Sequence, residues 1–175
     1  METKDLMKKA TLFHGHLCPG IAIGVLAAKL FLKYGFEHSP DEELVAVVET
    51  NNCSVDALQA ILSTTYGKGN LIHNDYGKNN YTVYSRKAHK AIRLSLKPSI
   101  LEDKKLSRDQ KIQKLLSLEP EAIFDISEVE YDPPDMAIIE DSVPCDVCGE
   151  FTMSSRIMNY QNRNICIPCY KQLKK

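Results

Sequence analysis

Four cysteines close to the C-terminus constrain the fold of this chain more than any other feature. They form two Cys-x2-Cys pairs separated by 17 residues, namely Cys145 with Cys148 and Cys166 with Cys169. Two pairs at this spacing are typical of a structural zinc site, in which four thiolates surround the ion as a closed tetrahedron. A polar tail of 31 residues cannot bury enough apolar surface to fold unaided. The sequence therefore predicts a structural Zn2+ here, with iron–sulfur ligation or unligated thiols as the alternatives.

The residues around these pairs favour a treble-clef-like domain. Gly149 suits the tight turn after the first pair, residues 151–165 can form a β-hairpin, and the run after Cys169 is typical of a helix start. We place this four-cysteine zinc-binding domain at residues 143–175 and the main domain at 1–142.

Length and composition predict one core domain with a small appendage. The chain has 175 residues, of which 43% are hydrophobic and 26% charged. It has no run of about 20 apolar residues, and Met1 to Lys9 lacks the apolar stretch of a signal peptide. We expect a soluble cytoplasmic protein without a membrane partner, whose cysteines serve metal binding or catalysis before disulfides.

Charge is segregated along the chain although the overall net charge is −1. The net charges are −3 for residues 1–77, +8 for 78–114, −11 for 115–150 and +5 for 151–175. A basic stretch followed by an acidic one can neutralise itself within the fold or across a dimer. The pattern therefore favours mutually paired faces over a nucleic-acid surface.

The main domain alternates helical and strand patterns. We predict helices from Pro19 to Gly35, after Cys53 with Ser54 as cap, and after Ser107, where Gln110 completes a capping box. Strands are predicted at 44–49, 81–85, 88–96 and 123–131, the third of these against a competing helical pattern. Residues 67–80 contain three glycines and several asparagines, and we predict that they form a loop.

A second group of metal-ligating residue types lies just before the first predicted helix. The run FHGHLCPG supplies His14, His16 and Cys18 within five residues, and Cys53 follows the first predicted strand. Such residues can ligate a borderline metal or pair as thiolate and imidazolium. Cys53 taken alone is more simply a packing residue.

These motifs together resemble one known family. FHGHLCPGIAIG, ETNNCSVDALQ, GKGNLIHNDYGK and the terminal CxxCGE…CIPCY are similar to the E subunit of formylmethanofuran dehydrogenase and its stand-alone relatives. The resemblance implies an α+β N-terminal domain with a mixed sheet and helices, a C-terminal zinc domain, and an intertwined homodimer. It also implies a metal cavity lined by His14, His16, Cys18 and Cys53.

One position departs from the family pattern. Thr64 occupies the place where relatives often carry a further cysteine, and a hydroxyl is a poor zinc ligand at neutral pH. His73 or Asp75 can supply a remaining ligand, whereas we interpret His38 and His89 as surface or packing residues.

We therefore predict a metal-binding protein that acts as an accessory or regulatory factor in one-carbon metabolism, alongside molybdenum or tungsten enzyme subunits. Its cofactors are a structural Zn2+ and a second transition metal, expected to be Zn2+. The first alternative is a zinc-dependent enzyme with Cys18, Cys53 and His16 as candidate catalytic residues. The second is a zinc-ribbon adaptor for nucleic acid or protein.

Overall fold

The computed structural model describes residues 2–100 and 105–174. Contacts between residues divide the chain into two compact units, Met1–Asp135 and Met136–Lys175. The boundary predicted from the sequence, near residue 142, falls inside the second unit.

Hydrogen bonds explain why the residues just before 142 belong with the second unit. The Asp141 carbonyl accepts a hydrogen bond from Ser154 N at 2.9 Å. The Glu140 carboxylate accepts another from Ser155 N at 3.0 Å. Neither bond can be foreseen from composition, because both join residues at least 13 positions apart.

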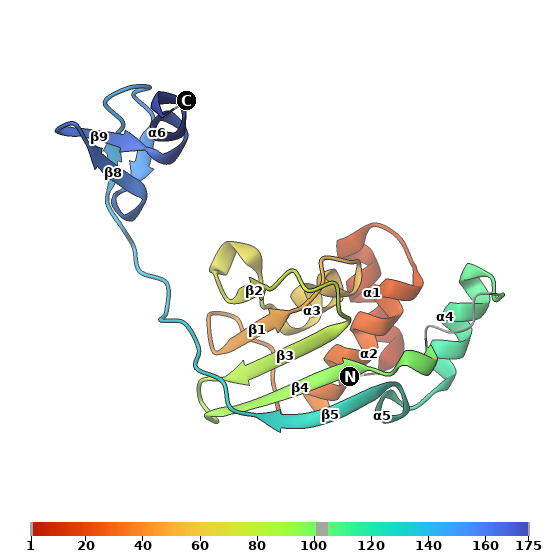
Figure 1. Ribbon diagram of the computed structural model, residues 1–175. Helices are drawn as coiled ribbons and strands as arrows, with labels where there is room; N and C mark the ends of the chain where they lie inside the picture. Colours follow the sequence, from red (N-terminus) through yellow and green to blue (C-terminus); the bar gives the residue numbers. More distant parts are fainter. Residues whose placement is uncertain (1, 101–104, 175) are drawn as a thin grey trace. The chain divides into compact units, whose positions relative to one another are not determined.

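A five-stranded mixed sheet forms the centre of the N-terminal unit (Figure 1). The β1–β2 pair is parallel and the other neighbouring pairs are antiparallel. Together with its helices, this sheet confirms the predicted α+β class. In spatial order the strands are β2 (Leu71–His73), β1 (Leu44–Val48), β3 (Asn80–Ser85), β4 (Lys90–Leu96) and β5 (Phe124–Val129).

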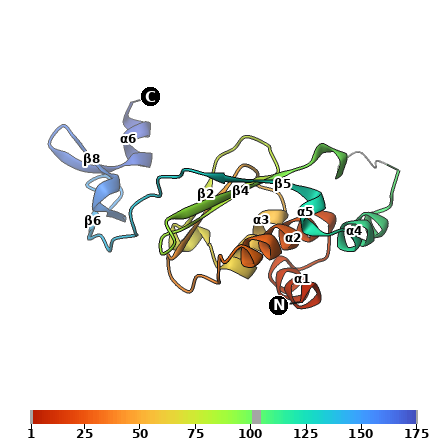
Figure 2. The same cartoon turned by 90° about the horizontal axis from the view of Figure 1, so that it is seen from below.

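Helices α1, α2 and α3 cover one face of the sheet (Figure 2). The α2 helix is apolar on nearly every side and lies buried between its neighbours, as its composition predicts. Along β1, Leu44, Ala46 and Val48 join the main core, whereas Val45 faces the other side of the sheet. The helices are α1 (Thr3–His14), α2 (Pro19–Lys33), α3 (Ser54–Leu62), α4 (Arg108–Ser117) and α5 (Pro120–Ile123).

Helices α2 and α3 approach each other closely at Gly24. A Cβ atom on Gly24 would lie 2.2 Å from the Ser54 carbonyl oxygen and 2.8 Å from the Ala57 Cβ. Only glycine leaves room for this backbone contact. The approach brings the start of α3 beside the start of α2, where the candidate ligands lie.

Helix α1 and strand β2 were not predicted from the sequence. The α1 helix buries only Leu6 and Ala10 in the core, so its apolar pattern is too sparse to stand out among the charges. The expected loop at 67–80 contains β2, a three-residue strand that is held by parallel pairing with β1 rather than by its own pattern.

Other predicted helices and strands are present, although some begin or end at different residues. The ambiguous segment at 88–96 is a strand, β4, and Ser107 with Gln110 forms the predicted capping box of α4. Cys53, rather than Ser54, is the N-cap residue of α3. Ser54 instead begins the helix, with its hydroxyl bonded to the Asn52 side chain.

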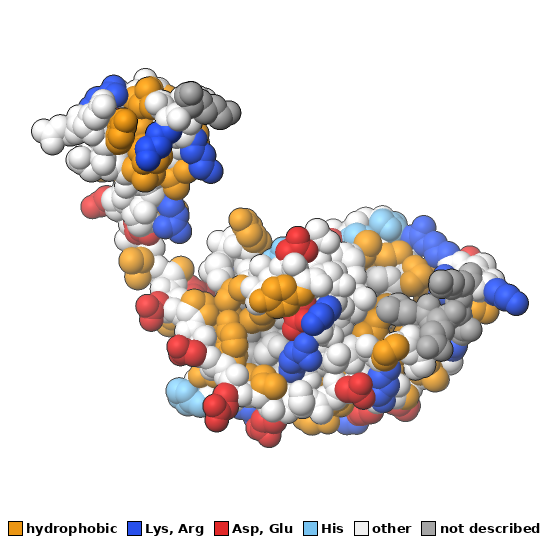
Figure 3. Space-filling model, in the orientation of Figure 1, with side chains coloured by type: hydrophobic (Ala, Val, Ile, Leu, Met, Phe, Trp, Pro, Cys, Tyr) orange, Lys and Arg blue, Asp and Glu red, His pale blue; other side chains and the backbone are white. Residues whose placement is uncertain are grey.

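The C-terminal unit consists of two small antiparallel ribbons and one helix. The hairpin predicted at 151–165 is formed by β8 and β9, and a further ribbon of β6 and β7 precedes it. Apolar side chains are conspicuous on the surface of this unit (Figure 3). The elements are β6 (Ser142–Pro144), β7 (Phe151–Met153), β8 (Ile157–Tyr160), β9 (Arg163–Cys166) and α6 (Ile167–Leu173).

Basic and acidic segments pair within the N-terminal unit. Lys90 lies 3.2 Å from Glu128, and Lys97 lies 3.9 Å from Asp125. Both acidic partners come from the strongly acidic stretch that follows the basic one. The expected mutual pairing of charged faces is therefore present for these two lysines.

Within residues 2–100 and 105–174, none of the helices combines the length and apolar character that crossing a bilayer requires.

Candidate metal centres

The N-terminal cluster lies where α1 ends and α2 begins. His14 is the last residue of α1, Gly15 turns the chain with a φ of 90°, and Cys18 is the N-cap of α2. One ligand atom from each of His14, His16 and Cys18 lies within 4.8 Å of the others. The short run that the sequence singled out therefore brings two imidazoles and a thiol together.

His14 has the environment of a metal ligand. Its Nδ1 lies 2.7 Å from the Asp56 Oδ2, whereas its Nε2 is buried without a hydrogen-bond partner among the described residues. A buried ring nitrogen is normally satisfied, because leaving it unpaired costs about 1–3 kcal/mol. The residues present thus suit a soft or borderline cation, which would use the unpaired nitrogen as a ligand atom.

The Cys18 thiol sits at the N-terminal end of α2. Its Sγ accepts a hydrogen bond from Ile21 N at 3.4 Å. Arg108 of α4 donates a hydrogen bond to the Leu17 carbonyl and fixes the backbone immediately before the thiol.

Cys53 lies beside Cys18 but outside the compact cluster of three. A Cβ placed on Gly20 would lie 3.0 Å from the Cys53 Cβ and 3.7 Å from the Cys18 Sγ, so both cysteines border this glycine. Burial and the neighbouring Cys18 thiol raise the pKa of Cys53 above its usual value. A cation between the two sulfurs would remove that penalty by neutralising their charge.

The other candidate ligands are not assembled around this cluster. His73 ends β2 and faces Asp75 at 4.0 Å, outside the groups that can hold an ion. Thr64 lies just beyond the C-terminal end of α3, whereas Cys53 caps its N-terminal end. Its hydroxyl is buried with no hydrogen-bond partner among the described residues. His38 and His89 are exposed surface residues that contact the Ile61 carbonyl and the Tyr84 hydroxyl.

A polar network supports the turn that carries Cys53. The Asn52 side chain accepts from Ser54 N at 3.0 Å and donates to the Asn79 Oδ1 at 2.6 Å. The Tyr81 hydroxyl donates to the Ser54 hydroxyl from the core. The ETNNC motif therefore contains side chains that hold the turn in place as well as a candidate ligand.

The GKGN motif has a structural role in loop closure. The Lys68 ammonium donates to the Ser39 and Asp41 carbonyls at 2.8 and 2.7 Å. The buried Asn70 side chain donates to the Leu44 carbonyl and accepts from Thr65 N. These bonds join the loop to the start of β1.

The C-terminal cluster contains all four predicted cysteines. The sulfur atoms of Cys145, Cys148, Cys166 and Cys169 all lie within 4.8 Å of one another. The first pair occupies a turn, whereas Cys166 is the N-cap of α6 and Cys169 lies in its first turn. The geometry provides a closed set of four thiol ligands, which suits a structural metal site.

The thiols of this cluster differ in proton affinity. Backbone N–H groups of Cys166 and Cys148 lower the pKa of Cys145 to about 6. The neighbouring Cys166 thiol raises the pKa of Cys169 to about 12. Four sulfurs this close cannot all ionise without a cation, so metal binding and loss of the thiol protons must occur together.

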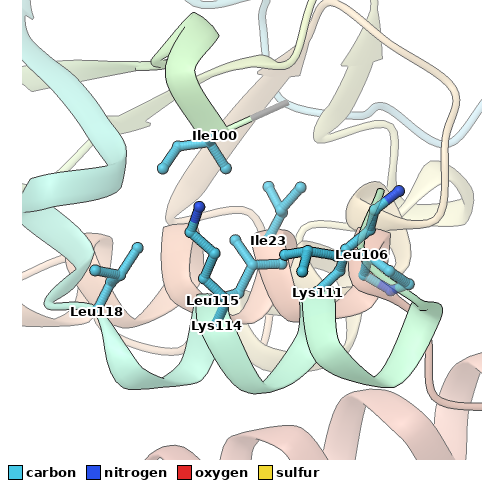
Figure 4. A pocket seen from close by; sticks show the side chains of 8 residues that line it. Ile23, Ile100, Leu106, Lys111, Lys114, Leu115 and Leu118 are labelled. Carbon is cyan, nitrogen blue, oxygen red and sulfur yellow. The ribbon is translucent and has the colours of Figure 1, made fainter. Parts of the chain in front are cut away.

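An apolar cavity of about 220 Å³ lies between α2 and α4. Figure 4 shows Ile23 of α2 and Leu115 of α4 among its walls, with Ile100 nearby. The lining residues are Pro19, Ile23, Ile100, Leu106, Lys111, Lys114, Leu115 and Leu118. None of them offers a metal ligand of the histidine or cysteine type.

Sequence reasoning missed Asp56. Its spacing of three residues from Cys53 on a predicted helix was an available signal, because residues i and i+3 share a helix face. Its contact with His14 joins residues 42 positions apart and required the packing of α1 on α3.

Fold and clusters together define an α+β protein with two groups of metal-ligating side chains in separate units. The profile of the family described as "FmdE, Molybdenum formylmethanofuran dehydrogenase operon" matches residues 13–129. The chain belongs to this FmdE family, which confirms the resemblance drawn from its motifs.

One curated relative and one solved structure extend the comparison. A protein of Archaeoglobus fulgidus described as "Probable S-adenosyl-L-methionine-binding protein" is 32% identical over 195 residues. The match covers 94% of this chain and 52% of the relative, so the chain spans about half the length of that protein. A crystal structure from Syntrophus aciditrophicus, of a protein like the E subunit (FmdE) of tungsten formylmethanofuran dehydrogenase, has a similar fold, with a TM-score of 0.73 at 20% identity. That match covers 98% of this chain and 94% of the other.

Proposed function

We propose that this chain is a metal-binding accessory protein of the FmdE family. In this proposal Cys145, Cys148, Cys166 and Cys169 hold a structural Zn2+. His14, His16 and Cys18 bind a second, exchangeable transition metal, Zn2+ by preference. Cys53 is available as a further ligand.

The unpaired His14 Nε2 carries the proposal of a second site. It is a buried acceptor beside a second imidazole and a thiol, and it has no hydrogen-bond partner among the described residues. Nitrogen and sulfur donors favour zinc and similar borderline cations over magnesium or calcium.

The accessory role rests on family membership and on the small size of the chain, whose 175 residues are few for a protein that holds a pterin by itself. We propose that the chain serves one-carbon metabolism beside molybdenum or tungsten enzyme subunits rather than carrying the redox cofactor itself. The pairing of Lys90 and Lys97 with acidic neighbours weakens the alternative of a nucleic-acid adaptor. It reduces the positive electrostatic potential that would attract a phosphate backbone.

A zinc-dependent reaction is a second candidate function. It is favoured by the separation of Cys53 from the compact cluster, which provides three ligands and leaves room for a fourth position. Bound zinc would supply Lewis acidity there. His14 and His16 would be occupied as ligands, so this candidate requires another group to accept the proton.

Elemental analysis of metal content tests the second site. We expect about two metal ions per wild-type chain and about one in Cys18→Ser, because the serine hydroxyl is a much weaker zinc ligand. His38→Gln is the matched control, since His38 bonds only to the Ile61 carbonyl among the described residues. About one zinc in both wild type and Cys18→Ser would contradict the proposed N-terminal site.

We also propose that the chain forms a homodimer. Large apolar side chains are exposed on both units: Leu12, Phe13 and Leu17 near the N-terminal cluster, and Met136, Ile138 and Ile139 at the start of the C-terminal unit. A groove of about 750 Å³ runs along α1 beside the first of these groups. Clustered exposed apolar side chains of this kind are characteristic of interfaces.

Light scattering during size-exclusion chromatography checks the homodimer. The expected mass is twice the 19.7 kDa of one chain at micromolar concentration. Leu12→Glu is expected to shift the mass toward one chain, whereas Tyr66→Glu, at an exposed aromatic far along the sequence, is the control. A mass of one chain at every concentration for the wild type would exclude a stable dimer.

A further inference from the structure

We propose that Asp56 is the positioning residue of the N-terminal centre. Its carboxylate accepts the Nδ1–H of His14, so that the neutral imidazole presents the lone pair of Nε2 to a metal. This inference rests on the proposed second metal site and adds a residue from outside the FHGHLCPG run, carried on the helix that follows Cys53. The contacts around His14 carry it.

Both oxygens of the Asp56 carboxylate have a hydrogen-bond partner. Oδ2 lies 2.7 Å from the His14 Nδ1, and Oδ1 accepts a hydrogen bond from the Gln59 Nε2 at 3.2 Å. An ionised carboxylate is an acceptor only, so the proton in the short contact belongs to the imidazole. Gln59 restrains the carboxylate from the next turn of the same helix.

The tautomer decides which atom of His14 can act as a ligand. With the proton on Nδ1, the lone pair is on Nε2, the buried nitrogen that lacks a partner among the described residues. The opposite tautomer would point a hydrogen at that place and exclude a cation. Carboxylates that accept the second ring N–H of a metal-bound histidine orient the ring and raise its basicity.

One turn of α3 supplies both Cys53 and Asp56. They are three residues apart, so they project from neighbouring positions at the start of the helix. The close approach at Gly24 fixes this start against α2, and the Asp56 bond fixes it to the end of α1. The Cys53 thiol and the Asp56 carboxylate are therefore held next to the N-terminal cluster by the same rigid helix start.

Nitrogen NMR of the metal-free protein tests the positioning role directly. We expect 15N-labelled wild type to show His14 with its proton on Nδ1 at neutral pH. Asp56→Asn is expected to shift the population toward the Nε2–H form, because the asparagine amide can donate to Nδ1. Asp109→Asn is the matched control, since Asp109 is an exposed aspartate in the first turn of α4. An unchanged tautomer in Asp56→Asn would overturn the proposal.

Zinc competition with a chelator measures the consequence for metal binding. Removing such a carboxylate typically weakens a metal site about 10–100-fold, and we expect a loss of about that size for Asp56→Asn at the N-terminal site alone. Equal affinities in wild type and Asp56→Asn would overturn the role. The NMR result needs no metal, so it decides the role of Asp56 even where the elemental analysis rejects the second metal site.

Discussion

Replacing Cys145 with serine is expected to unfold the C-terminal unit while leaving the N-terminal unit folded. The buried core of the C-terminal unit consists of Ile165 and three of the four clustered cysteines, with Tyr160 and Tyr170 packed against it. So small a core cannot hold the C-terminal unit together without the proposed zinc ion, because zinc binding supplies about 10–16 kcal/mol of folding free energy in comparable modules.

Amide hydrogen exchange measures this outcome. In Cys145→Ser, amides of β8, β9 and α6 should lose their protection, whereas those of β3 and β4 should keep it. Cys53→Ser is the control, since Cys53 belongs to the N-terminal unit and should leave the tail protected. Protection of the tail at wild-type levels in Cys145→Ser would contradict a metal-dependent fold. Treatment of the wild type with a strong chelator should reproduce the effect of the variant.

Replacing Gly24 with alanine is expected to destabilise the N-terminal unit by about 2–3 kcal/mol. The new methyl group would overlap the Ser54 carbonyl oxygen, at 2.2 Å, and a backbone atom cannot turn aside as a flexible side chain can. Helix α3 would have to move away from α2. Its displacement would also disturb Cys53 and Asp56, so metal affinity at the N-terminal site should fall together with stability.

Urea denaturation followed by circular dichroism checks the expected loss. Gly67→Ala provides a matched substitution, because a Cβ at Gly67 would meet nothing within 4 Å. It should change the free energy of unfolding by less than about 1 kcal/mol. If Gly24→Ala is as stable as Gly67→Ala, the close approach of the two helices is not a constraint on the fold.

Local patterns were sufficient to predict the elements whose formation depends on local sequence. The α2 helix is apolar on nearly all sides over 15 residues, and the α4 helix begins with a capping box. The four-cysteine cluster could be predicted because the Cys-x2-Cys spacing alone brings the two thiols of each pair close together. Each of these signals is contained in a short window of sequence.

The missed features depend on distant partners instead. The β2 strand has only three residues and is held by pairing with β1, which lies more than 20 positions earlier. Asp56 looked like an ordinary first-turn acid of a helix, and only the packing of α1 on α3 brings it to His14. Sequence patterns indicate which residue types can ligate a metal, but the side chains that orient those ligands come from the tertiary fold.

The division into two units gives the two proposed metals different thermodynamic roles. The N-terminal cluster is attached to a sheet and helices with an extensive apolar core, so its ligands are assembled before any ion arrives. The C-terminal cysteines form most of their own core, so there the ion and the fold are gained or lost together. If both proposed sites hold zinc, scarcity would empty the N-terminal site at little structural cost, whereas the C-terminal unit would keep its ion until it unfolds. The occupancy of the N-terminal site would then follow the concentration of available zinc, whereas the zinc of the C-terminal unit would be a fixed structural component.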